Sequence, residues 1–319
     1  MSNDILVFVE HLNGEVTDAT YELLATARTL AAQTGGSVEA AVIGAGATGL
    51  AASLGGADRV LVADTDALGA FNPQGHAAVF SGLVASREPA LVLVPYTSVG
   101  MEIGNQVAVA NSLPLVSYCL SVDASTGLSA TCQLYSGKVE ADVVVDGERA
   151  VFAMLAGAAS ADDGRSGGAA VAEDVDVTIP DLAVSFVGIA EPEGGDVDIT
   201  AGEVLVAIGR GIESEDNIEE AQELADALGA PLAASRPIID QGWLPKTRQV
   251  GKSGLTVKPK VYLALGISGA PEHLEGMRDS ATIIAVNSDP QAPIFGVAHY
   301  GWVGDLFDFI PELTERLDG

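Results

Sequence analysis

The chain has 319 residues, 48% of them hydrophobic, which is enough apolar material for two domains with cores of their own. Its 44 acidic and 15 basic residues give a formal net charge of −29, which excludes nucleic acid as a partner because phosphate contacts need positive charge. No apolar run approaches the roughly 18 residues of a membrane-spanning helix, and no basic region stands before the first apolar stretch, so we expect no signal peptide. We therefore expect a cytoplasmic protein without a membrane span.

The first half of the chain alternates short apolar runs with longer helical patterns. The strand-like runs are 5–9, 38–43, 60–62 and 90–94, and the helical patterns are 19–32 and 76–85. This rhythm predicts a parallel sheet with crossover helices, and hence an α/β fold. Short strand-like segments that predict a hairpin region follow at 115–120, 131–135, 140–145 and 150–155. Residues 156–175 are rich in Gly, Ala, Ser and Asp and predict a mobile surface loop.

A second α/β unit begins near Glu203. Its strand-like and helical segments follow in the order 204–208, 218–228, 262–265 and 282–286. We place the boundary at residue 202, so that the sequence predicts an N-terminal domain of residues 1–202 and a C-terminal domain of residues 203–319.

The acidic residues are spread along the chain, with modest clusters at 191–198 and 213–220. Dispersed charge of one sign predicts a solvated surface, whose self-repulsion is screened when salt shortens the Debye length to about 3 Å at 1 M. We therefore expect a halophilic source, with an acidic protein from a low-salt organism as the alternative. The two cysteines, Cys119 and Cys132, match the spacing of neither a zinc pair nor a redox pair, so we expect reduced, partly buried thiols.

One glycine-rich loop in the first half fits a dinucleotide-binding pattern. Gly44-Ala-Gly-Ala-Thr-Gly49 follows a predicted strand and reads G-x-G-x-x-G, with Asp64 about twenty residues further on, as in NAD sites. However, the strand before it is the second of its domain, and a chain with 37 glycines produces such a match easily by chance. We interpret the loop as structural and keep an NAD-dependent dehydrogenase as an alternative function.

A second glycine-rich loop, near the C-terminus, is more informative. Residues 261–273 read VYLALGISGAPEH, a buried strand that runs into a glycine-serine turn closing on His273. Gly266, Ser268 and Gly269 in such a turn expose backbone N–H groups at the carboxyl edge of a sheet, where phosphates and flavin carbonyls are commonly held. The stretch predicts a nucleotide site.

Arg210 and Arg236 are two of only ten arginines, and both follow small residues in loop-like motifs. In a chain that otherwise avoids positive charge, this placement favours neutralisation of a bound anion. A surface ion pair is the alternative for each.

These features belong to an ordered series of motifs. The series comprises AIGRG at 207–211, ASRP at 234–237, GWLP at 242–245, QVGKSG at 249–254, GISGA at 266–270, AVNSDPQAPIF at 285–295 and YGWVGDLF at 300–307. Weaker signals in the first half are VEH at 9–11, PYTS at 95–98 and YSGK at 135–138. Together they resemble the alpha subunit of electron-transfer flavoproteins, the FixB-like group included.

The resemblance implies two Rossmann-like parallel-sheet domains, of which the N-terminal one serves as scaffold and subunit contact and the C-terminal one binds FAD. It implies an electron carrier and no enzyme of its own: electrons would pass from dehydrogenases, such as the acyl-CoA dehydrogenases of fatty acid β-oxidation, to a quinone reductase or similar acceptor. The implied partner is a beta subunit, with one FAD per heterodimer and AMP or a second FAD in the beta subunit. No catalytic residue or metal ligand is expected, and a regulatory module that holds ADP or AMP without redox work is the alternative from another class.

The resemblance also implies a set of cofactor-binding residues. Arg210 would face the ADP half of FAD and Ser235 its pyrophosphate, while Arg236 would lie over the flavin ring, where a fixed cation stabilises the charge of the reduced ring. Ser253 would approach flavin N5 and O4, and a protonated His273 the pyrimidine oxygen. The other implied contacts are Val250, Gly251, Lys252, Ser268, Gly269, Ala270, Pro271, Glu272, Asn287, Asp305 and Leu306. Without the resemblance, Asp305 would be interpreted as a helix cap and Ser253 as a turn residue.

The chain departs from the family pattern at a few positions. Pro271-Glu272 stands where Ile-Gln is often found, Lys252 replaces a glutamine, and His299 replaces an aspartate. Because Pro271 lacks an N–H donor and Glu272 adds negative charge, we predict that this pair tunes the reduction potential.

Overall fold

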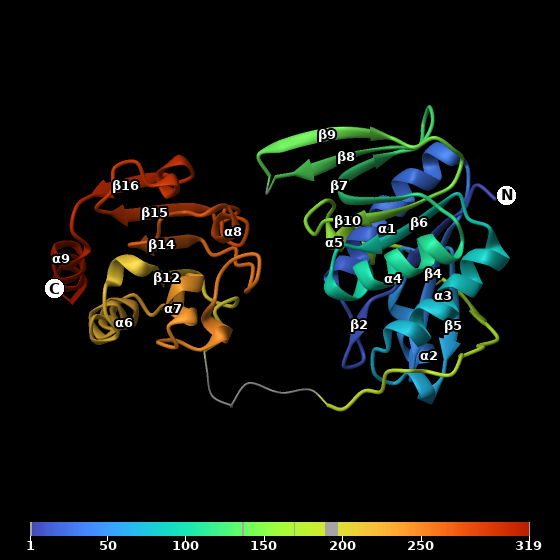
Figure 1. The fold of residues 1–319 in the computed structure, drawn as a ribbon, viewed down its shortest axis with the longest axis horizontal. Coiled ribbons are helices and arrows are strands. Elements are labelled where there is room, and N and C mark those ends of the chain that lie inside the picture. Colours follow the sequence, from blue (N-terminus) through green and yellow to red (C-terminus); the bar gives the residue numbers. More distant parts are fainter. Residues whose placement is uncertain (1, 136, 169, 189–196, 319) are drawn as a thin grey trace. The chain divides into compact units, whose positions relative to one another are not determined.

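The computed structural model describes residues 2–135, 137–168, 170–188 and 197–318. The chain forms two compact units that divide between residues 188 and 189, each built on its own β-sheet (Figure 1). The α/β class expected from the sequence is confirmed. Ile199 already packs in the core of the C-terminal unit, and the domain boundary at residue 202 stays a prediction.

The N-terminal unit contains, within the described residues, a nine-stranded sheet in the order β11-β5-β4-β1-β6-β10-β7-β8-β9. The strands are β1 (Ile5–Phe8), β4 (Val38–Gly44), β5 (Arg59–Asp64), β6 (Leu91–Pro95), β7 (Leu115–Asp123), β8 (Ser129–Leu134), β9 (Val139–Val144), β10 (Ala150–Met154) and β11 (Val171–Asp174). From β11 to β7 neighbouring strands run parallel, whereas β8 and β9 are added antiparallel at one edge. A separate antiparallel pair joins β2 (His11–Leu12) to β3 (Glu15–Val16).

Helices cover both faces of this sheet. They are α1 (Asp18–Thr34), α2 (Ala47–Leu50), α3 (Pro73–Arg87), α4 (Ser98–Ala110) and α5 (Ala161–Arg165), with the 3₁₀ turns η1 (Ala51–Ser53) and η2 (Asp66–Leu68). Strand β1 explains the arrangement, because Ile5 and Val7 pack in the core beneath α1 whereas Leu6 and Phe8 pack in the core beneath α3 and α4. A strand that is apolar on both sides is typical of a parallel sheet covered on both faces.

Two expectations for residues 150–175 are wrong. Strand β10 does not belong to the hairpin region but lies buried between β6 and β7, parallel to both. The expected mobile loop contains α5, which packs against α1, and β11, which pairs with β5. Small residues serve close packing here: a Cβ on Gly164 would lie 1.8 Å from the carbonyl oxygen of Tyr21. Composition alone does not distinguish a loop from such a contact.

The two cysteines are free and buried, and they lie directly opposite each other on β7 and β8. Burial raises the pKa of both thiols, most strongly that of Cys119. Both are more deeply buried than the sequence suggested, and their reduced state stays a prediction.

The C-terminal unit contains a parallel sheet in the order β13-β12-β14-β15-β16. Its strands are β12 (Val204–Ile208), β13 (Leu232–Ala234), β14 (Val261–Leu265), β15 (Thr282–Asn287) and β16 (Tyr300–Val303). Its helices are α6 (Ile218–Ala227), α7 (Arg236–Asp240), α8 (Pro271–Leu274) and α9 (Leu306–Asp318), with the turns η3 (Arg210–Ile212), η4 (Glu215–Asn217), η5 (Lys246–Arg248) and η6 (Pro293–Gly296). The strands expected at 204–208, 262–265 and 282–286 are confirmed as β12, β14 and β15.

The strand order of this unit creates a crevice. The chain leaves β12 for β13 on one side, then crosses back to place β14 on the other side. At such a reversal the crossover connections diverge, and ligands of open α/β sheets bind outside the carboxyl ends of the two strands. The sheet therefore directs the site to the ends of β12 and β14.

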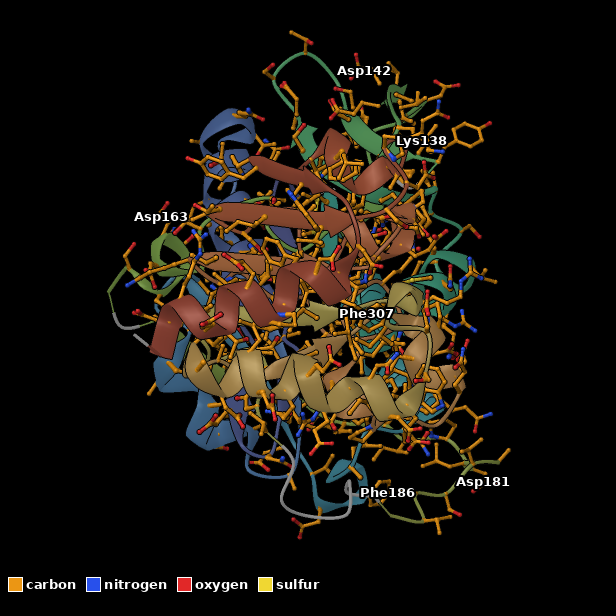
Figure 2. All side chains as sticks on the ribbon, turned by 90° about the vertical axis from the view of Figure 1, so that its left-hand side faces the viewer. Lys138, Asp142, Asp163, Asp181, Phe186 and Phe307 are labelled. Carbon is orange, nitrogen blue, oxygen red and sulfur yellow. The ribbon has the colours of Figure 1, made fainter. Side chains whose placement is uncertain are left out.

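The acidic side chains lie on the surface. Among the described residues, Glu39 is the one acidic residue that is buried, and Arg59 and Arg87 flank its carboxylate at 3.4 and 3.9 Å. Asp142, Asp163 and Asp181 have exposed side chains (Figure 2). In the described ranges no helix has both the length and the apolar character that a membrane span requires.

Candidate functional site

A cavity of about 760 Å³ opens at the carboxyl edge of the C-terminal sheet. Its wall is formed by loops that follow four neighbouring strands and by the segment after η5: 210–213, 235–240, 249–253, 266–273 and 287–293. The cavity therefore lies at the reversal of strand order, and its size is within the range of small-molecule and cofactor sites.

The pocket wall contains every residue that the sequence predicted except Gly269, Pro271, Asp305 and Leu306. Gly269 and Pro271 shape the loop from within, and a Cβ on Gly269 would come within 2.3 Å of the Ile294 nitrogen. Asp305 caps α9, because its Oδ1 accepts a hydrogen bond of 3.0 Å from the Phe307 N–H. Leu306 is buried in the core beneath α9.

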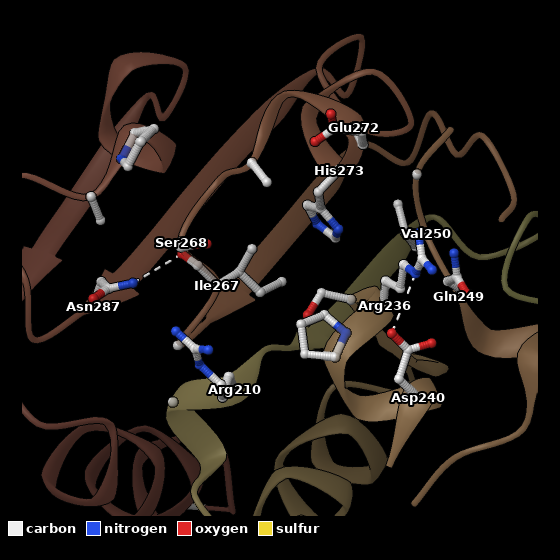
Figure 3. A pocket seen from close by; sticks show the side chains of 18 of the residues that line it. Arg210, Arg236, Asp240, Gln249, Val250, Ile267, Ser268, Glu272, His273 and Asn287 are labelled. Atoms are coloured by element: carbon white, nitrogen blue, oxygen red, sulfur yellow. Dashed lines mark hydrogen bonds and ion pairs between the residues drawn. The ribbon is translucent and has the colours of Figure 1, made fainter. Parts of the chain in front are cut away.

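Arg210 lies towards one end of the pocket, near Asn287 (Figure 3). Its side chain is exposed and pairs with no carboxylate within the described residues, although 44 acidic residues are available in the chain. The Asn287 amide is used internally, because Nδ2 donates to the Ile267 carbonyl at 2.9 Å and Oδ1 accepts from the Asp289 N–H at 2.9 Å. Arg210 therefore offers a free cation, while Asn287 fixes the two loops beside it.

Arg236 lies towards the other end, where it begins α7 directly after Ser235 (Figure 3). Its Nε is 3.3 Å from Oδ2 of Asp240, and both side chains are exposed. The surface ion pair that we considered for Arg236 is thus present, but the guanidinium also lines the pocket and uses only one of its five N–H groups in that bond. No role was predicted for Asp240 from the sequence, although its i, i+4 spacing from Arg236 indicates an ion pair when both lie on a helix.

The loop at 249–253 is held by hydrogen bonds that the sequence did not reveal. Gln249 is buried, and its Nε2 donates to Oγ of Ser253 at 2.9 Å. Ser253 therefore accepts from Gln249 and can donate its own hydrogen to a ligand. The Lys252 N–H donates to the Glu272 carbonyl at 2.7 Å, which ties this loop to α8. Gln249 is the first residue of the QVGKSG motif, and no other feature of the sequence indicated its role.

His273 lies on α8 and is 6% exposed, and its ring extends into the pocket (Figure 3). Its Nε2 is 2.9 Å from the hydroxyl oxygen of Tyr262, whereas Nδ1 has no hydrogen-bond partner within the described residues. Burial lowers the pKa of His273 to about 4, against a smaller opposing effect of the Val250 backbone. The ring is therefore neutral near pH 7, and the protonated imidazole expected from the sequence is not favoured in this structure.

The donors of the pocket fit a ligand that is rich in acceptor oxygens. Arg210 supplies a free cation, Ser253 a hydroxyl hydrogen, and Nδ1 of His273 an orphaned buried polar atom. Because buried polar atoms in native structures nearly always have a partner, the orphaned Nδ1 points to a bound group. A dinucleotide with phosphates and ring carbonyls presents the matching acceptors.

The glycine-rich loop of the N-terminal unit is already occupied by the chain itself. Oδ1 of Asp64 accepts from the Gly46 N–H at 2.9 Å, and Oδ2 accepts from the N–H and the hydroxyl of Thr48 at 3.0 and 2.6 Å. These bonds lower the pKa of Asp64, with the Thr48 hydroxyl as the largest cause. A carboxylate thus takes the place that a phosphate would need, which removes the support for an NAD site here.

Comparison with known families agrees with the position of the pocket in the chain. Residues 198–278 match the family described as "Electron transfer flavoprotein FAD-binding domain", and residues 5–180 match "Electron transfer flavoprotein domain". The chain belongs to the electron-transfer flavoprotein alpha subunit family.

Several relatives are similar over nearly the whole chain. The alpha subunit of Thermoanaerobacterium thermosaccharolyticum is 35% identical, over 98% of this chain and 97% of its own. The alpha subunit of Bacillus subtilis is 34% identical, over 99% and 98%. Subunit LctC of the lactate dehydrogenase (NAD(+),ferredoxin) of Acetobacterium woodii is 35% identical, over 99% of this chain and 77% of its own. Among solved structures, a putative thiamin diphosphate-dependent enzyme from Mycobacterium smegmatis is 13% identical over 98% of this chain and 60% of its own, with a TM-score of only 0.26.

The His273 pKa predicts a pH dependence of stability. Because burial lowers this pKa from 6.5 to about 4, the fold favours the neutral ring, so its contribution to stability is complete above pH 6.5 and is lost as the pH falls towards 4. We expect urea unfolding of the chain without added cofactor to show a loss of roughly 3 kcal/mol over this window, and His273→Gln to lack that part of the loss. Parallel curves for the two proteins would contradict the assignment.

Proposed function

We propose that this protein is the FAD-binding alpha subunit of a heterodimeric electron-transfer flavoprotein. The observation that carries the proposal is the pocket at the ends of β12 and β14, which is lined by unpaired donors and lies largely in the segment that matches the FAD-binding domain family. It would accept electrons from dehydrogenases, acyl-CoA dehydrogenases among them, and deliver them to a quinone reductase or similar acceptor.

When bound, FAD supplies one-electron and two-electron chemistry, and the protein supplies position and charge. Arg210 and Ser235 would bind the ADP half and the pyrophosphate. Arg236 would hold positive charge beside the ring, and Ser253 would donate its hydroxyl hydrogen to a ring acceptor. The carboxylate of Asp240 would attenuate the charge of Arg236, because the two form an ion pair.

Two of the three departures from the family pattern include residues that line the pocket. Glu272 lines the pocket with an exposed side chain, which supports the hypothesis that Pro271 and Glu272 tune the reduction potential. Lys252 also lines the pocket, and its Nζ is 3.5 Å from Oε2 of Glu275. His299 lies elsewhere and accepts a hydrogen bond of 3.0 Å at Nδ1 from the Ile283 N–H.

The family also suggests partners. We propose a beta subunit as the constant partner, one FAD per heterodimer, and AMP or a second FAD in the beta subunit. The N-terminal unit would serve as scaffold and subunit contact, because its own dinucleotide-like loop is closed by Asp64. The name of the Acetobacterium woodii relative associates that protein with a lactate dehydrogenase, which supports dehydrogenases as electron donors.

FAD affinity tests the proposal directly. We expect the chain, co-expressed with its beta subunit and purified in molar KCl, to bind FAD, and Arg210→Ala to weaken binding about 10-fold or more, because a charge-assisted hydrogen bond contributes roughly 1.5–3 kcal/mol. The matched control is Arg278→Ala, which removes an exposed arginine of the same unit outside the pocket wall. Absence of FAD binding by the unaltered complex, or equal losses in both variants, would contradict the proposal.

Reduction potentials test the charge at the ring. Arg236→Ala should lower the flavin potential, since it removes a cation that stabilises the reduced ring, and Asp240→Asn should raise it, since it removes the paired anion. We expect shifts on the order of 60 mV, equivalent to a tenfold change in a one-electron equilibrium. Asp226→Asn, an exposed carboxylate of α6 outside the pocket wall, is the control. Shifts of the same sign in the Arg236 and Asp240 variants would show that the pair does not act in this way.

We also propose a halophilic source for the protein. The net charge of −29 lies almost wholly on the surface, where its self-repulsion is relieved by salt. The midpoint of thermal unfolding should rise, and the refolding yield should increase, as KCl is raised from dilute buffer to molar concentration. Full stability and full refolding in dilute buffer would favour a low-salt source.

A further inference from the structure

Tyr262 is the largest side chain that is fully buried in the described part of the molecule, and its hydroxyl reaches the cofactor pocket through His273. It lies on β14, on the sheet face where its neighbours are apolar residues such as Leu205 and Ile283. The hydroxyl oxygen is 2.9 Å from Nε2 of His273 and has no other hydrogen-bond partner within the described residues. A buried polar group thus connects the core of the C-terminal unit to the pocket wall.

The direction of this hydrogen bond follows from counting donors and acceptors. If Nε2–H donated to Tyr262, the phenolic hydrogen would be buried without an acceptor, and Nδ1 would be a second unsatisfied atom. If Tyr262 donates to Nε2, its hydrogen is satisfied, and the proton of the neutral ring resides on Nδ1. The first arrangement thus leaves two buried polar groups without a partner, whereas the second leaves one, the Nδ1–H group. Because an unsatisfied buried group costs about 1–3 kcal/mol, the second arrangement is favoured.

The surroundings of the ring agree with this arrangement. Burial lowers the pKa of His273, which makes the ring neutral near pH 7 and leaves a single proton to place. The backbone of Val250 opposes that shift, but Nδ1 has no hydrogen-bond partner within the described residues and stays available to the pocket. The hydrogen bond between Tyr262 and Nε2 therefore places that single proton on Nδ1.

We propose that Tyr262 is a positioning residue, whose buried hydroxyl donates to Nε2 of His273 and holds the neutral imidazole in the Nδ1–H tautomer. His273 then presents a hydrogen-bond donor, and not an acceptor, at the pocket wall. The use of this donor rests on the proposed function, because it would be offered to a ring carbonyl oxygen of the flavin. A neutral donor also stabilises added negative charge on the flavin ring less than a protonated imidazole would, so the positive charge of the pocket wall comes from its arginines and Lys252.

The tautomer can be measured on the full chain without cofactor. The sequence has only 4 histidines, so nitrogen-15 NMR of the imidazole rings gives few signals, and His273→Gln identifies the pair that belongs to His273. Near pH 7 we expect a protonated Nδ1 and a non-protonated Nε2. A protonated Nε2 with a bare Nδ1, or a doubly protonated ring, would overturn the proposal.

A variant then tests whether Tyr262 determines the tautomer. Tyr262→Phe keeps the shape of the ring and removes the hydroxyl, and we expect it to yield a mixture of both His273 tautomers. The control, Tyr300→Phe, removes the hydroxyl of a tyrosine that is 67% exposed and should leave the signals unchanged. An unchanged tautomer in Tyr262→Phe would overturn the proposal. Should that variant fail to fold, 3-fluorotyrosine incorporation strengthens the phenolic donor, and the Nε2 signal must shift.

FAD affinity measured on the complex with the beta subunit separates this inference from the proposed function. Tyr262→Phe should weaken binding about 3- to 10-fold, the effect of one hydrogen bond, and should add nothing in the His273→Gln background, because Tyr262 acts through His273. Additive losses would overturn the positioning role. An unaltered complex that binds no FAD would contradict the proposed function. The tautomer measured on the chain without cofactor would not be affected by that result.

Discussion

The order of strands in the C-terminal sheet is the constraint on which the site depends. Because the order of the strands reverses at β12, the loops after β12 and β14 diverge and leave the carboxyl edge open between them. Backbone and side-chain donors from four strand ends consequently converge on one cavity. Close approach of these loops requires glycine: a Cβ on Gly266 would lie 2.7 Å from Cα of Gly211. The glycine-rich motif at 266–270 is thus a packing requirement of the fold.

The two units show how the same architecture gains or loses a nucleotide site. In the C-terminal unit, Arg210 stands free at a strand end, and the one described carboxylate bonded to a pocket arginine is Asp240. In the N-terminal unit, Asp64 binds the amides of the glycine loop, and Glu10, at the end of β1, accepts a hydrogen bond from Thr97 after β6. That unit also reverses its strand order between β1 and β6, and a carboxylate of the chain lies at each of these two places.

Much of the fold and the site follows from local sequence patterns. Buried apolar runs located β12, β14 and β15, and the ordered motifs located most of the pocket wall, because loops at parallel strand ends must meet at one edge. Tertiary packing could not be predicted: β10 inserts between β6 and β7, and α5, in the glycine-rich segment before β11, packs against α1. Gln249 and Tyr262 were missed, and His273 was expected to be protonated, because these properties depend on burial and on partners distant in sequence.

The central claim is that redox-active FAD binds in the C-terminal pocket, and the visible spectrum of the complex with its beta subunit tests it most directly. The unaltered complex should show the absorption of oxidised flavin and lose it on titration with dithionite. The double variant Arg210→Ala/Arg236→Ala should be largely colourless, whereas Thr48→Ala, in the glycine loop of the N-terminal unit, should keep the flavin. A colourless unaltered complex, or loss of flavin from the Thr48 variant with retention in the arginine double variant, would contradict the account.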